Sequence, residues 1–178
     1  RILKFDGGTW DFERLYVPSF LAPGGHSERQ ITWVRERLRK AFGIAPENTK
    51  ERHLYVSRRD AASRRLDNEA AILPLLEKYG FEIIAPGELT LAEQISKFSE
   101  AAVIVGVAGS GLTNFAFAEP GCTLIEFHPA DYINPAYWFM ANAVGHKYWF
   151  EIGETVNEAQ DFTIELERVE AALKAVLV

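Results

Sequence analysis

The chain has 178 residues, of which 48% are hydrophobic and 25% are charged, as is typical of a globular protein with one domain and a sizeable core. Its formal net charge of −6 argues against a general nucleic-acid binder, which needs a basic surface. The one cysteine, Cys122, excludes an internal disulfide framework and indicates a reducing compartment, so we expect a cytoplasmic protein. No hydrophobic run approaches the roughly 20 residues of a transmembrane segment. The start at Arg1 leads us to expect a fragment of a longer protein.

The first elements are a short strand, a loop and a helix. Residues 15–17 predict the strand, and residues 22–26 predict a glycine-containing loop. Ser27 and Gln30 have the spacing of a capping box, and Gly43 is placed to end the helix that follows. The apolar residues of this helix recur at helical spacing: Ile31, Val34, Leu38 and Phe42.

The next unit is a strand, a polar loop and a second helix. Residues 53–57 predict the strand, and residues 58–67 form an arginine-rich loop. Asn68 is suited to cap the helix, which Gly80 ends. Pro74 lies inside this helix, so we expect it to kink the helix or to move its start.

The third unit leads to the centre of the predicted sheet. Residues 81–85 predict a strand, and Thr90 and Glu93 form a second capping box. The helix after this box has three apolar residues on one face: Leu91, Ile95 and Phe98. Residues 102–105, rich in β-branched side chains, then predict a buried strand that stops at Gly106.

A glycine turn follows this strand. Gly109 and Gly111 flank a serine, and residues 112–118 predict a helix directly after them. Glycines let the backbone approach a ligand closely, and the unpaired N–H groups of a helix start favour an anion such as a phosphate. The next strand, residues 122–127, carries Glu126 near its end, where a carboxylate can accept hydrogen bonds from ribose hydroxyls. The alternative is that the glycines only allow tight packing of the strand on the helix.

The last part of the chain continues the alternation. Asn134 and Pro135 predict a helix start, and Gly145 is placed to end that helix. Residues 147–150 predict a strand, and residues 153–161 a polar loop. The final helix has four apolar residues on one face: Leu166, Val169, Leu173 and Val176.

The alternation of about six strands with helices predicts an α/β fold, a parallel sheet with helices on both faces. We expect one Rossmann-like domain over residues 1–178. In such sheets the ligand binds beyond the carboxyl ends of the strands. The loops at 58–68, 106–114 and 126–131 should therefore converge on one site.

The arginine-rich loop is the candidate phosphate-binding segment. Its guanidinium groups can pair with phosphate oxygens in a bidentate way, and they belong to four residues: Arg58, Arg59, Arg64 and Arg65. Arg58 follows the strand directly and is the best candidate, whereas Arg59 should point the other way. The alternative is a solvated, flexible loop with surface ion pairs.

Other chemistries have little support in the sequence. The four histidines show no metal-ligand spacing: His26, His53, His128 and His146. His128 is a candidate base, or else simply an exposed loop residue. There is no GxSxG elbow and no GxxxxGK[ST] phosphate loop. The aromatic residues between 137 and 150 are interpreted as core packing.

Four segments together resemble a known family: YVSRR, RRLDNE, GFEIIAPGELTLAEQISKFSEAAVIVGVAGSGLTN and PGCTLIEFHP. They are similar to the C-terminal half of glycosyltransferase family 61, whose bacterial members are often described as capsular or exopolysaccharide biosynthesis proteins. The resemblance is clear from about residue 54 to 129. It implies a GT-B enzyme, in which two Rossmann-like domains face a cleft and the C-terminal one holds most of a nucleotide-sugar donor.

The resemblance also implies which residues bind the donor, with Arg58 and Arg64 on the diphosphate. Carried over by position, the full set is Arg58, Arg64, Asn68, Glu69, Gly109, Ser110, Gly111, Leu112, Thr113, Asn114 and Glu126. No bound metal or other cofactor is implied. The N-terminal domain, which would bring the saccharide acceptor and the catalytic base, is expected to be missing. We therefore name no catalytic residue and expect the fragment alone to be inactive.

One departure from the family pattern leaves alternatives open. Many members have a histidine before the second glycine of the turn, where this chain has Ala108. A domain that binds nucleotide without catalysis is therefore one alternative. A nicotinamide-dependent Rossmann enzyme is another, because Gly109 and Gly111 followed by an acid on the next strand resemble a dinucleotide fingerprint. Against the second alternative, Asn114 replaces the third glycine of that fingerprint.

Overall fold

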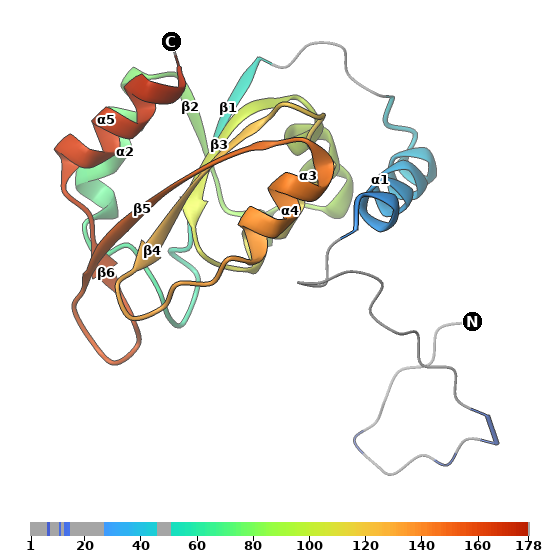
Figure 1. Ribbon diagram of the computed structural model, residues 1–178, viewed down its shortest axis with the longest axis horizontal. Coiled ribbons are helices and arrows are strands. Elements are labelled where there is room, and N and C mark those ends of the chain that lie inside the picture. Colours follow the sequence, from blue (N-terminus) through green and yellow to red (C-terminus); the bar gives the residue numbers. More distant parts are fainter. Residues whose placement is uncertain (1–6, 8–10, 12, 15–26, 46–50, 178) are drawn as a thin grey trace.

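The computed structural model describes residues 7, 11, 13–14, 27–45 and 51–177 (Figure 1). The strand expected at 15–17 and the loop expected at 22–26 lie outside these residues. The described part is a mixed α/β structure with a central sheet. Its strands are β1 (Arg52–Val56), β2 (Phe81–Ile84), β3 (Ala101–Val107), β4 (Thr123–Pro129), β5 (Lys147–Thr155) and β6 (Phe162–Thr163).

The six strands lie in the order β2-β1-β3-β4-β5-β6. The pairs from β2 to β5 are parallel, and β6 pairs with β5 in the antiparallel direction. The expectation of a wholly parallel sheet is therefore wrong at its edge. β5 continues to Thr155, into the segment predicted as a loop, and β6 returns beside it as a two-residue strand.

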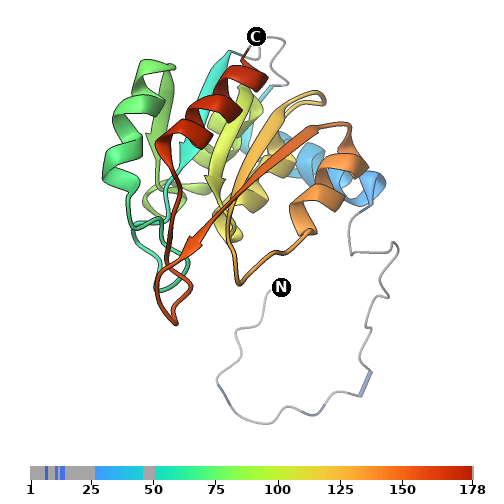
Figure 2. The same cartoon turned by 60° about the vertical axis from the view of Figure 1, so that its left-hand side comes forward.

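Helices cover both faces of the sheet, as expected (Figure 2). The helices are α1 (Glu28–Phe42), α2 (Glu69–Lys78), α3 (Leu91–Ser99), α4 (Ala136–Val144) and α5 (Leu166–Val176), with the 3-10 helices η2 (Pro86–Glu88) and η3 (Ser110–Phe117). Two apolar clusters form the core. In one, Ile72 of α2 and Leu173 of α5 pack on one face of the sheet. In the other, residues of α3, η3 and α4 pack on the opposite face.

Local sequence signals set several helix ends. Thr90 and Glu93 form the predicted capping box at the start of α3. Ser27 directly precedes α1, but its side chain makes no capping hydrogen bond, so the capping box expected there is wrong. Asn68 precedes α2 without capping it, because its side chain bonds to the backbone of Ile164 instead. Pro74 lies inside α2 without moving the start of that helix.

The segment around the glycine turn differs from the prediction in two ways. β3 does not stop at Gly106 but runs on to Val107, and the helix after the turn is a 3-10 helix, η3. A β-carbon on Gly106 would lie 2.8 Å from Leu112 Cδ2 and 3.0 Å from Val56 Cβ. Gly106, which precedes the two glycines of the predicted turn, thus allows β3 to pack closely on β1 and η3.

Helix α1 packs through arginines and not through its whole apolar stripe. Arg35 and Arg39 are buried, whereas Val34 and Phe42 are 43% and 45% exposed. Arg35 Nη1 donates to the carbonyl of Ala118 at 2.9 Å. Arg39 donates to the carbonyl of Phe117 at 2.6 Å and pairs with Glu119. Hydrogen bonds and an ion pair from these two guanidinium groups thus hold α1 against the end of η3.

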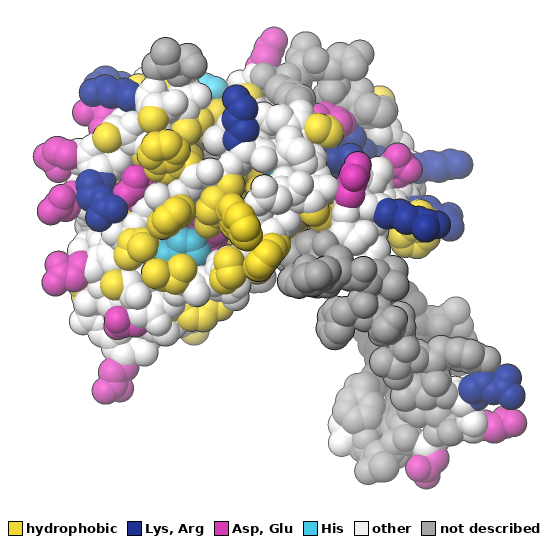
Figure 3. Space-filling model, in the orientation of Figure 1, with side chains coloured by type: hydrophobic (Ala, Val, Ile, Leu, Met, Phe, Trp, Pro, Cys, Tyr) yellow, Lys and Arg dark blue, Asp and Glu magenta, His cyan; other side chains and the backbone are white. Residues whose placement is uncertain are grey.

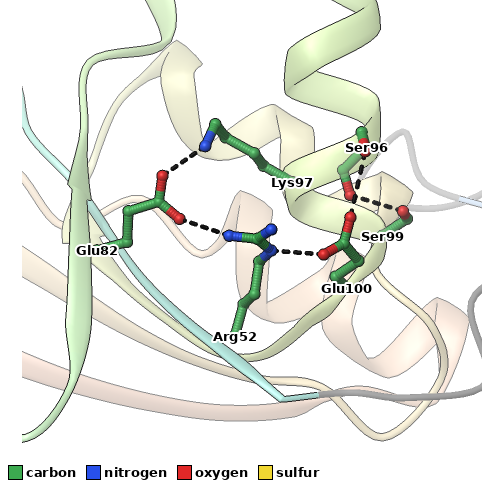
Figure 4. Close-up of polar contacts among 6 residues, drawn as sticks. All are labelled: Arg52, Glu82, Ser96, Lys97, Ser99 and Glu100. Atoms are coloured by element: carbon green, nitrogen blue, oxygen red, sulfur yellow. Dashed lines mark hydrogen bonds and ion pairs between the residues drawn. The ribbon is translucent and has the colours of Figure 1, made fainter.

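A polar network lies at the amino-terminal edge of the sheet, opposite the edge where β1 and β3 end (Figure 4). Arg52 donates to Glu82 at 2.9 Å and to Glu100 at 2.5 Å. Lys97 of α3 pairs with the same Glu82, and its hydrogen bond is the main reason that the pKa of Glu82 is lowered. This network links β1, β2 and α3 away from the predicted site.

Candidate functional site

The centre of the sheet contains a topological switch point between β1 and β3. From β1 the chain crosses to β2 through α2 on one face, and from β2 it crosses back to β3 through α3 on the other face. The connections leave β1 and β3 in opposite directions, and ligands of open α/β sheets bind in the crevice this creates. The end of β1 lies beside that of β3, with Val56 paired to Gly106.

Arg58, the second residue after β1, lies against the glycine turn. A β-carbon on Gly109 would lie 1.7 Å from Arg58 Nη1 and 2.6 Å from its Cζ, so only a glycine leaves room for this guanidinium. The Nη2 atom donates to the carbonyl of Ser63 at 3.0 Å. The expected convergence of the loops at 58–68 and 106–114 is therefore confirmed.

The electrostatic environment of Arg58 is unfavourable to its charge. Its Nε atom is buried and has no hydrogen-bond partner among the described residues. Burial, and then the charge of Arg64, lowers the pKa of the Arg58 guanidinium below its usual value. An anion at this position would compensate both effects.

Arg64 reaches the same site from the far end of the loop. Its backbone has a left-handed φ of 53°, which is uncommon for a residue other than glycine. Its Nε donates to the carbonyl of Ala108 at 3.2 Å, and its guanidinium lies 4.3 Å from the ring centre of Tyr132. Its backbone N–H bonds to Ala159 at 3.0 Å. These contacts hold the loop in place at Arg64, unlike the flexible loop of the alternative interpretation.

The other two loop arginines make ion pairs elsewhere. Arg59 is exposed and pairs with Glu88 at 2.9 Å. Arg65 pairs with the buried Asp161 at 2.8 Å. For Arg59 the ion-pair alternative is correct, in keeping with the expectation that it points away.

The glycine turn presents backbone groups to the same region. Gly109 is extended, with a φ of 176°, and Ser110 begins η3. The first N–H groups of a helix have no partner within it, so they are available to an acceptor. The carbonyl of Gly109 accepts a hydrogen bond of 2.7 Å from the Tyr137 hydroxyl, which lies 3.2 Å from Thr113 Oγ1.

Glu126 belongs to a buried polar cluster on β4 and β5. Its exposed fraction is 1%, and its Oε2 accepts a hydrogen bond of 2.7 Å from the Tyr148 hydroxyl. His128 Nε2 lies 3.3 Å from the same oxygen and 3.2 Å from the Tyr148 hydroxyl. Burial, and then the charge of Glu126, raises the pKa of Tyr148, which therefore stays protonated as a donor. Oε1 of Glu126 is buried and has no partner among the described residues.

His128 is not the exposed loop residue that one interpretation of the sequence expects. It lies in β4 and is 1% exposed, and the ring centre of Phe150 lies 6.4 Å from that of its imidazole. Figure 3 shows one face of the molecule, on which hydrophobic side chains gather. His128 and Glu126 are both buried and lie 3.3 Å apart, so the imidazole packs directly against the carboxylate.

Two hollows flank the contact between Arg58 and Gly109, and Ser110 lines both. The first, the Glu126 cavity, has a volume of about 150 Å³. Its walls include Arg64, Ser110, Glu126, Tyr132, Asn134 and Tyr137. The second, the polar hollow, has a volume of about 410 Å³. Its walls include Ser57, Arg58, Asp60, Gln94, Ser110 and Asn114. The structure thus brings the arginine loop, the glycine turn and the end of β4 together, as predicted.

Several expected site residues lie elsewhere or act through the backbone. The side chain of Asn68 bonds to Ile164, and Glu69 accepts a hydrogen bond of 2.8 Å from the Tyr55 hydroxyl. Neither residue lines the two hollows. Leu112 is fully buried in the core. Asn114 lines the polar hollow, with its amide bound to Gln94 at 2.8 Å.

Sequence reasoning missed the hydroxyl groups at this site. Tyr137 and Tyr148 fall in the stretch that was interpreted as packing, yet each donates a hydrogen bond to a site group. The position of Tyr137 in the sequence could have indicated its role, because a residue in the first turn of α4 lies close to the carboxyl edge of the sheet.

Two further searches concern the described residues only. None of their helices is long and apolar enough to cross a membrane. No group of three or more histidine, cysteine, aspartate or glutamate side chains among them could hold a metal ion.

The fold and site define a mixed α/β protein with cationic and backbone hydrogen-bond donors at the switch point of its sheet. A model of the family described as Glycosyltransferase 61 matches residues 10–125. The chain belongs to the glycosyltransferase 61 family. No curated protein matches it significantly. The matched range contains Arg58, Arg64 and the glycine turn, whereas Glu126 lies just after its end.

Proposed function

We propose that this chain is the donor-binding domain of a GT-B glycosyltransferase, holding a nucleotide-diphosphate sugar. It acts together with an N-terminal domain, which brings the saccharide acceptor and the catalytic base. Residues 1–178 form a single nucleotide-sugar-binding domain of a C-terminal half, and the product is a capsular or exopolysaccharide. Membership of the glycosyltransferase 61 family supports the transfer reaction, and the resemblance to bacterial members supports the product.

The observation that carries the proposal is the contact between Arg58 and Gly109 at the switch point. A half-buried guanidinium, on which the charge of Asp60 acts but which forms no ion pair among the described residues, lies against an extended glycine, directly before the first N–H groups of η3. Both kinds of donor suit a diphosphate, because phosphate oxygens accept charge-assisted and backbone hydrogen bonds. Arg64, 3.2 Å from the carbonyl of Ala108, adds a second positive charge beside the turn.

The Glu126 carboxylate is evidence for a nucleoside in the adjoining cavity. Its Oε2 accepts a hydrogen bond from the Tyr148 hydroxyl, so its buried Oε1 remains available as an acceptor. A ribose has hydroxyl groups that could donate to this oxygen. The rings of Tyr132 and Tyr137 line the same cavity and offer apolar surface to a base.

The reaction chemistry follows from these groups. Glycosyl transfer breaks the bond between the anomeric carbon and the phosphate oxygen, and negative charge develops on the leaving diphosphate. Arg58, Arg64 and the N–H groups of the turn would stabilise that charge, and removing one such donor typically costs roughly 3 kcal/mol of transition-state stabilisation. We propose that this site works without a metal ion and that the chain is cytoplasmic.

Calorimetric titration with nucleosides, nucleoside diphosphates and NAD tests the proposal. Arg58→Ala should weaken nucleoside diphosphate binding about ten- to a hundredfold and leave nucleoside binding nearly unchanged, because a charge-assisted hydrogen bond contributes on the order of 1.5–3 kcal/mol. Glu126→Ala should weaken the binding of both, since its partner is the ribose.

Arg59→Ala is the matched control, because Arg59 is the neighbouring arginine but pairs with Glu88 at the surface. It should have little effect on either ligand. Equal losses for nucleoside and diphosphate in Arg58→Ala, together with a lower melting temperature, would instead indicate a damaged fold. Tight binding of NAD without binding of any nucleoside diphosphate would favour the dinucleotide alternative.

A further inference from the structure

Strand β5 forms an edge of the sheet over most of its length. It pairs with β4 from Lys147 to Gly153, whereas β6 covers its other side only at Glu154 and Thr155. Between residues 147 and 153, no other strand of the described part of the chain lies on that side. An uncovered strand edge presents unpaired backbone groups, to which a further strand can bind.

The hydrogen bonds to β4 show which backbone groups point toward this edge. At the start of β5, the Lys147 N–H donates to the carbonyl of Cys122 at 2.9 Å. Farther along, the carbonyl of Gly153 accepts from the Ala130 N–H at 3.0 Å, and the register between these two bonds is continuous. Successive residues of a strand direct their N–H and carbonyl groups to opposite sides. Residues 147, 149, 151 and 153 therefore face β4, and residues 148, 150 and 152 face the edge.

Two of the three edge-facing residues have unpaired backbone groups. The carbonyl of Ile152 already accepts a hydrogen bond of 2.8 Å from Arg168. The N–H and carbonyl groups of Tyr148 and Phe150 have no partner among the described residues. The edge thus offers two donors and two acceptors, spaced two residues apart.

The side chains of this edge are aromatic and largely exposed. Trp149 is 42% exposed and Phe150 is 51% exposed, and Tyr148 is half-buried. Figure 3, in the orientation of Figure 1, shows hydrophobic side chains gathered over β5 and α4. Proteins commonly protect such an edge with a charge, a proline or a bulge, and none of these lies between Lys147 and Glu151. The edge therefore has the properties of a strand that is covered by a partner.

The charges on either side of the aromatic residues are of opposite sign. Lys147 is exposed and forms no ion pair with another described residue. Glu151, on the same face of the strand, accepts hydrogen bonds from Arg168 and, at 3.1 Å, from Trp149 Nε1. If two copies of β5 pair in the antiparallel direction around a twofold axis at Trp149, each Lys147 lies opposite Glu151 of the other copy. Opposite charges directly across a strand pair attract.

The same register uses the unpaired backbone groups. It places Tyr148 of each copy opposite Phe150 of the other, and such a pair exchanges two hydrogen bonds. The two equivalent pairs therefore use all the unpaired groups of both residues. The two copies of Trp149 face each other on the axis, in the type of pair where side chains lie closest.

Neighbouring registers fit less well. Moving the axis one residue forward would require the carbonyl of Ile152, which already accepts from Arg168. Moving it one residue back would require the N–H of His146, which donates to the carbonyl of Ala141 at 2.9 Å. Either shift would also separate the opposite charges.

We propose that β5 is a homodimer interface, in which the β5 strands of two copies pair antiparallel around a twofold axis at Trp149 and join the two sheets. A twofold contact uses the same surface on both copies, so neither copy keeps an open β5 edge. The interface lies next to the Glu126 cavity, because the Tyr148 hydroxyl donates to Glu126. This inference does not depend on the proposed function.

Sedimentation equilibrium tests the dimer. The mass of the unaltered chain should rise from monomer to dimer between micromolar and near-millimolar concentration. Lys147→Glu should raise the dimer dissociation constant roughly tenfold, because it places like charges opposite each other at two positions. Lys40→Glu is the matched control, since Lys40 is exposed on α1 and the change alters the net charge equally. It should leave the dissociation constant nearly unchanged.

Two outcomes of this experiment overturn the inference. A chain that stays monomeric throughout leaves the edge to a different partner. Equal effects of the two charge variants, or no effect of either, show that β5 does not form the contact.

Cysteine cross-linking tests the register. In the pair on the axis the Cα atoms would lie about 4.5 Å apart, within the range that a disulfide spans. Trp149→Cys should therefore cross-link two copies under mild oxidation. Phe150→Cys is the control, because its counterpart lies diagonally across at roughly 7–8 Å, which is too far for a disulfide. Cys122 is buried, so the unaltered chain should not cross-link. Cross-linking of Phe150→Cys as strong as that of Trp149→Cys, or of neither variant, overturns the inference.

Discussion

Replacing Gly109 by alanine should displace the Arg58 guanidinium from the glycine turn without unfolding the protein. The added methyl group would lie 1.7 Å from Nη1 and 2.6 Å from Cζ, so the guanidinium must move. The φ of Gly109 is 176°, an extended value that alanine adopts without strain. Because the obstructing atoms are the end of a flexible side chain, the fold can adjust. Alanine also gives the unfolded chain fewer conformations than glycine does, and this effect favours folding of the variant by roughly 0.4–1 kcal/mol.

The expected loss of affinity follows from the hydrogen bond that Arg58 would no longer donate to the diphosphate. If Arg58 contributes a charge-assisted hydrogen bond of about 1.5–3 kcal/mol, Gly109→Ala should weaken nucleoside diphosphate binding about ten- to a hundredfold, as Arg58→Ala does. In the double variant, Arg58→Ala with Gly109→Ala, the alanine at 109 should add little further loss of affinity, since no guanidinium remains to displace. Calorimetric titration of the unaltered chain, the two single variants and the double variant gives the coupling free energy between the two positions. A loss from Gly109→Ala that is the same with and without Arg58 would refute the reasoning.

Gly106→Ala is the matched control for this experiment. Its β-carbon would meet Leu112, the side chain of Val56 and, at 3.1 Å, the carbonyl oxygen of Val56. These atoms are buried and cannot move away easily, so the change should cost roughly 1–3 kcal/mol of unfolding free energy. Thermal unfolding should show a melting temperature lower by on the order of 2–12 °C. Gly109→Ala should show no such decrease.

Two further predictions concern metal ions and pH. Nucleoside diphosphate binding should be the same with and without EDTA, because no carboxylate cluster accompanies the turn among the described residues; a loss of affinity on chelation would contradict this. Hydrogen bonds from Arg65 and Asn157 hold the pKa of Asp161 well below its usual value, so its contribution to stability is present above about pH 4 and is lost as the pH falls further. Asp161→Asn should therefore lower the melting temperature more at pH 7 than at pH 3, and an equal decrease at both values would show that the contribution is not electrostatic.

The alternation of strands and helices could be predicted because each element carries its own local signal. Gly43 and Gly145 end their helices in the left-handed conformation, with φ of 68° and 72°. The Thr90–Glu93 box starts α3. Convergence of the arginine loop and the glycine turn also followed from the sequence, since parallel strands end at one edge of a sheet.

The missed features depend on contacts between distant residues. β6 has only two residues, and it forms because the chain turns back along β5. Burial of Arg35 and Arg39 depends on the carbonyls of Ala118 and Phe117, which no helical pattern in α1 reveals. His128 followed a predicted strand end, and the longer β4 placed it inside the protein.

The attachment of α1 to η3 has a mechanical consequence for the turn. η3 has eight residues, and it is held near its start by the Tyr137 hydroxyl and at its end by Arg35 and Arg39. A segment this short and fixed at both ends transmits displacement instead of absorbing it. We therefore expect that a change in the position of α1 would also displace Gly109 and alter the geometry of the turn.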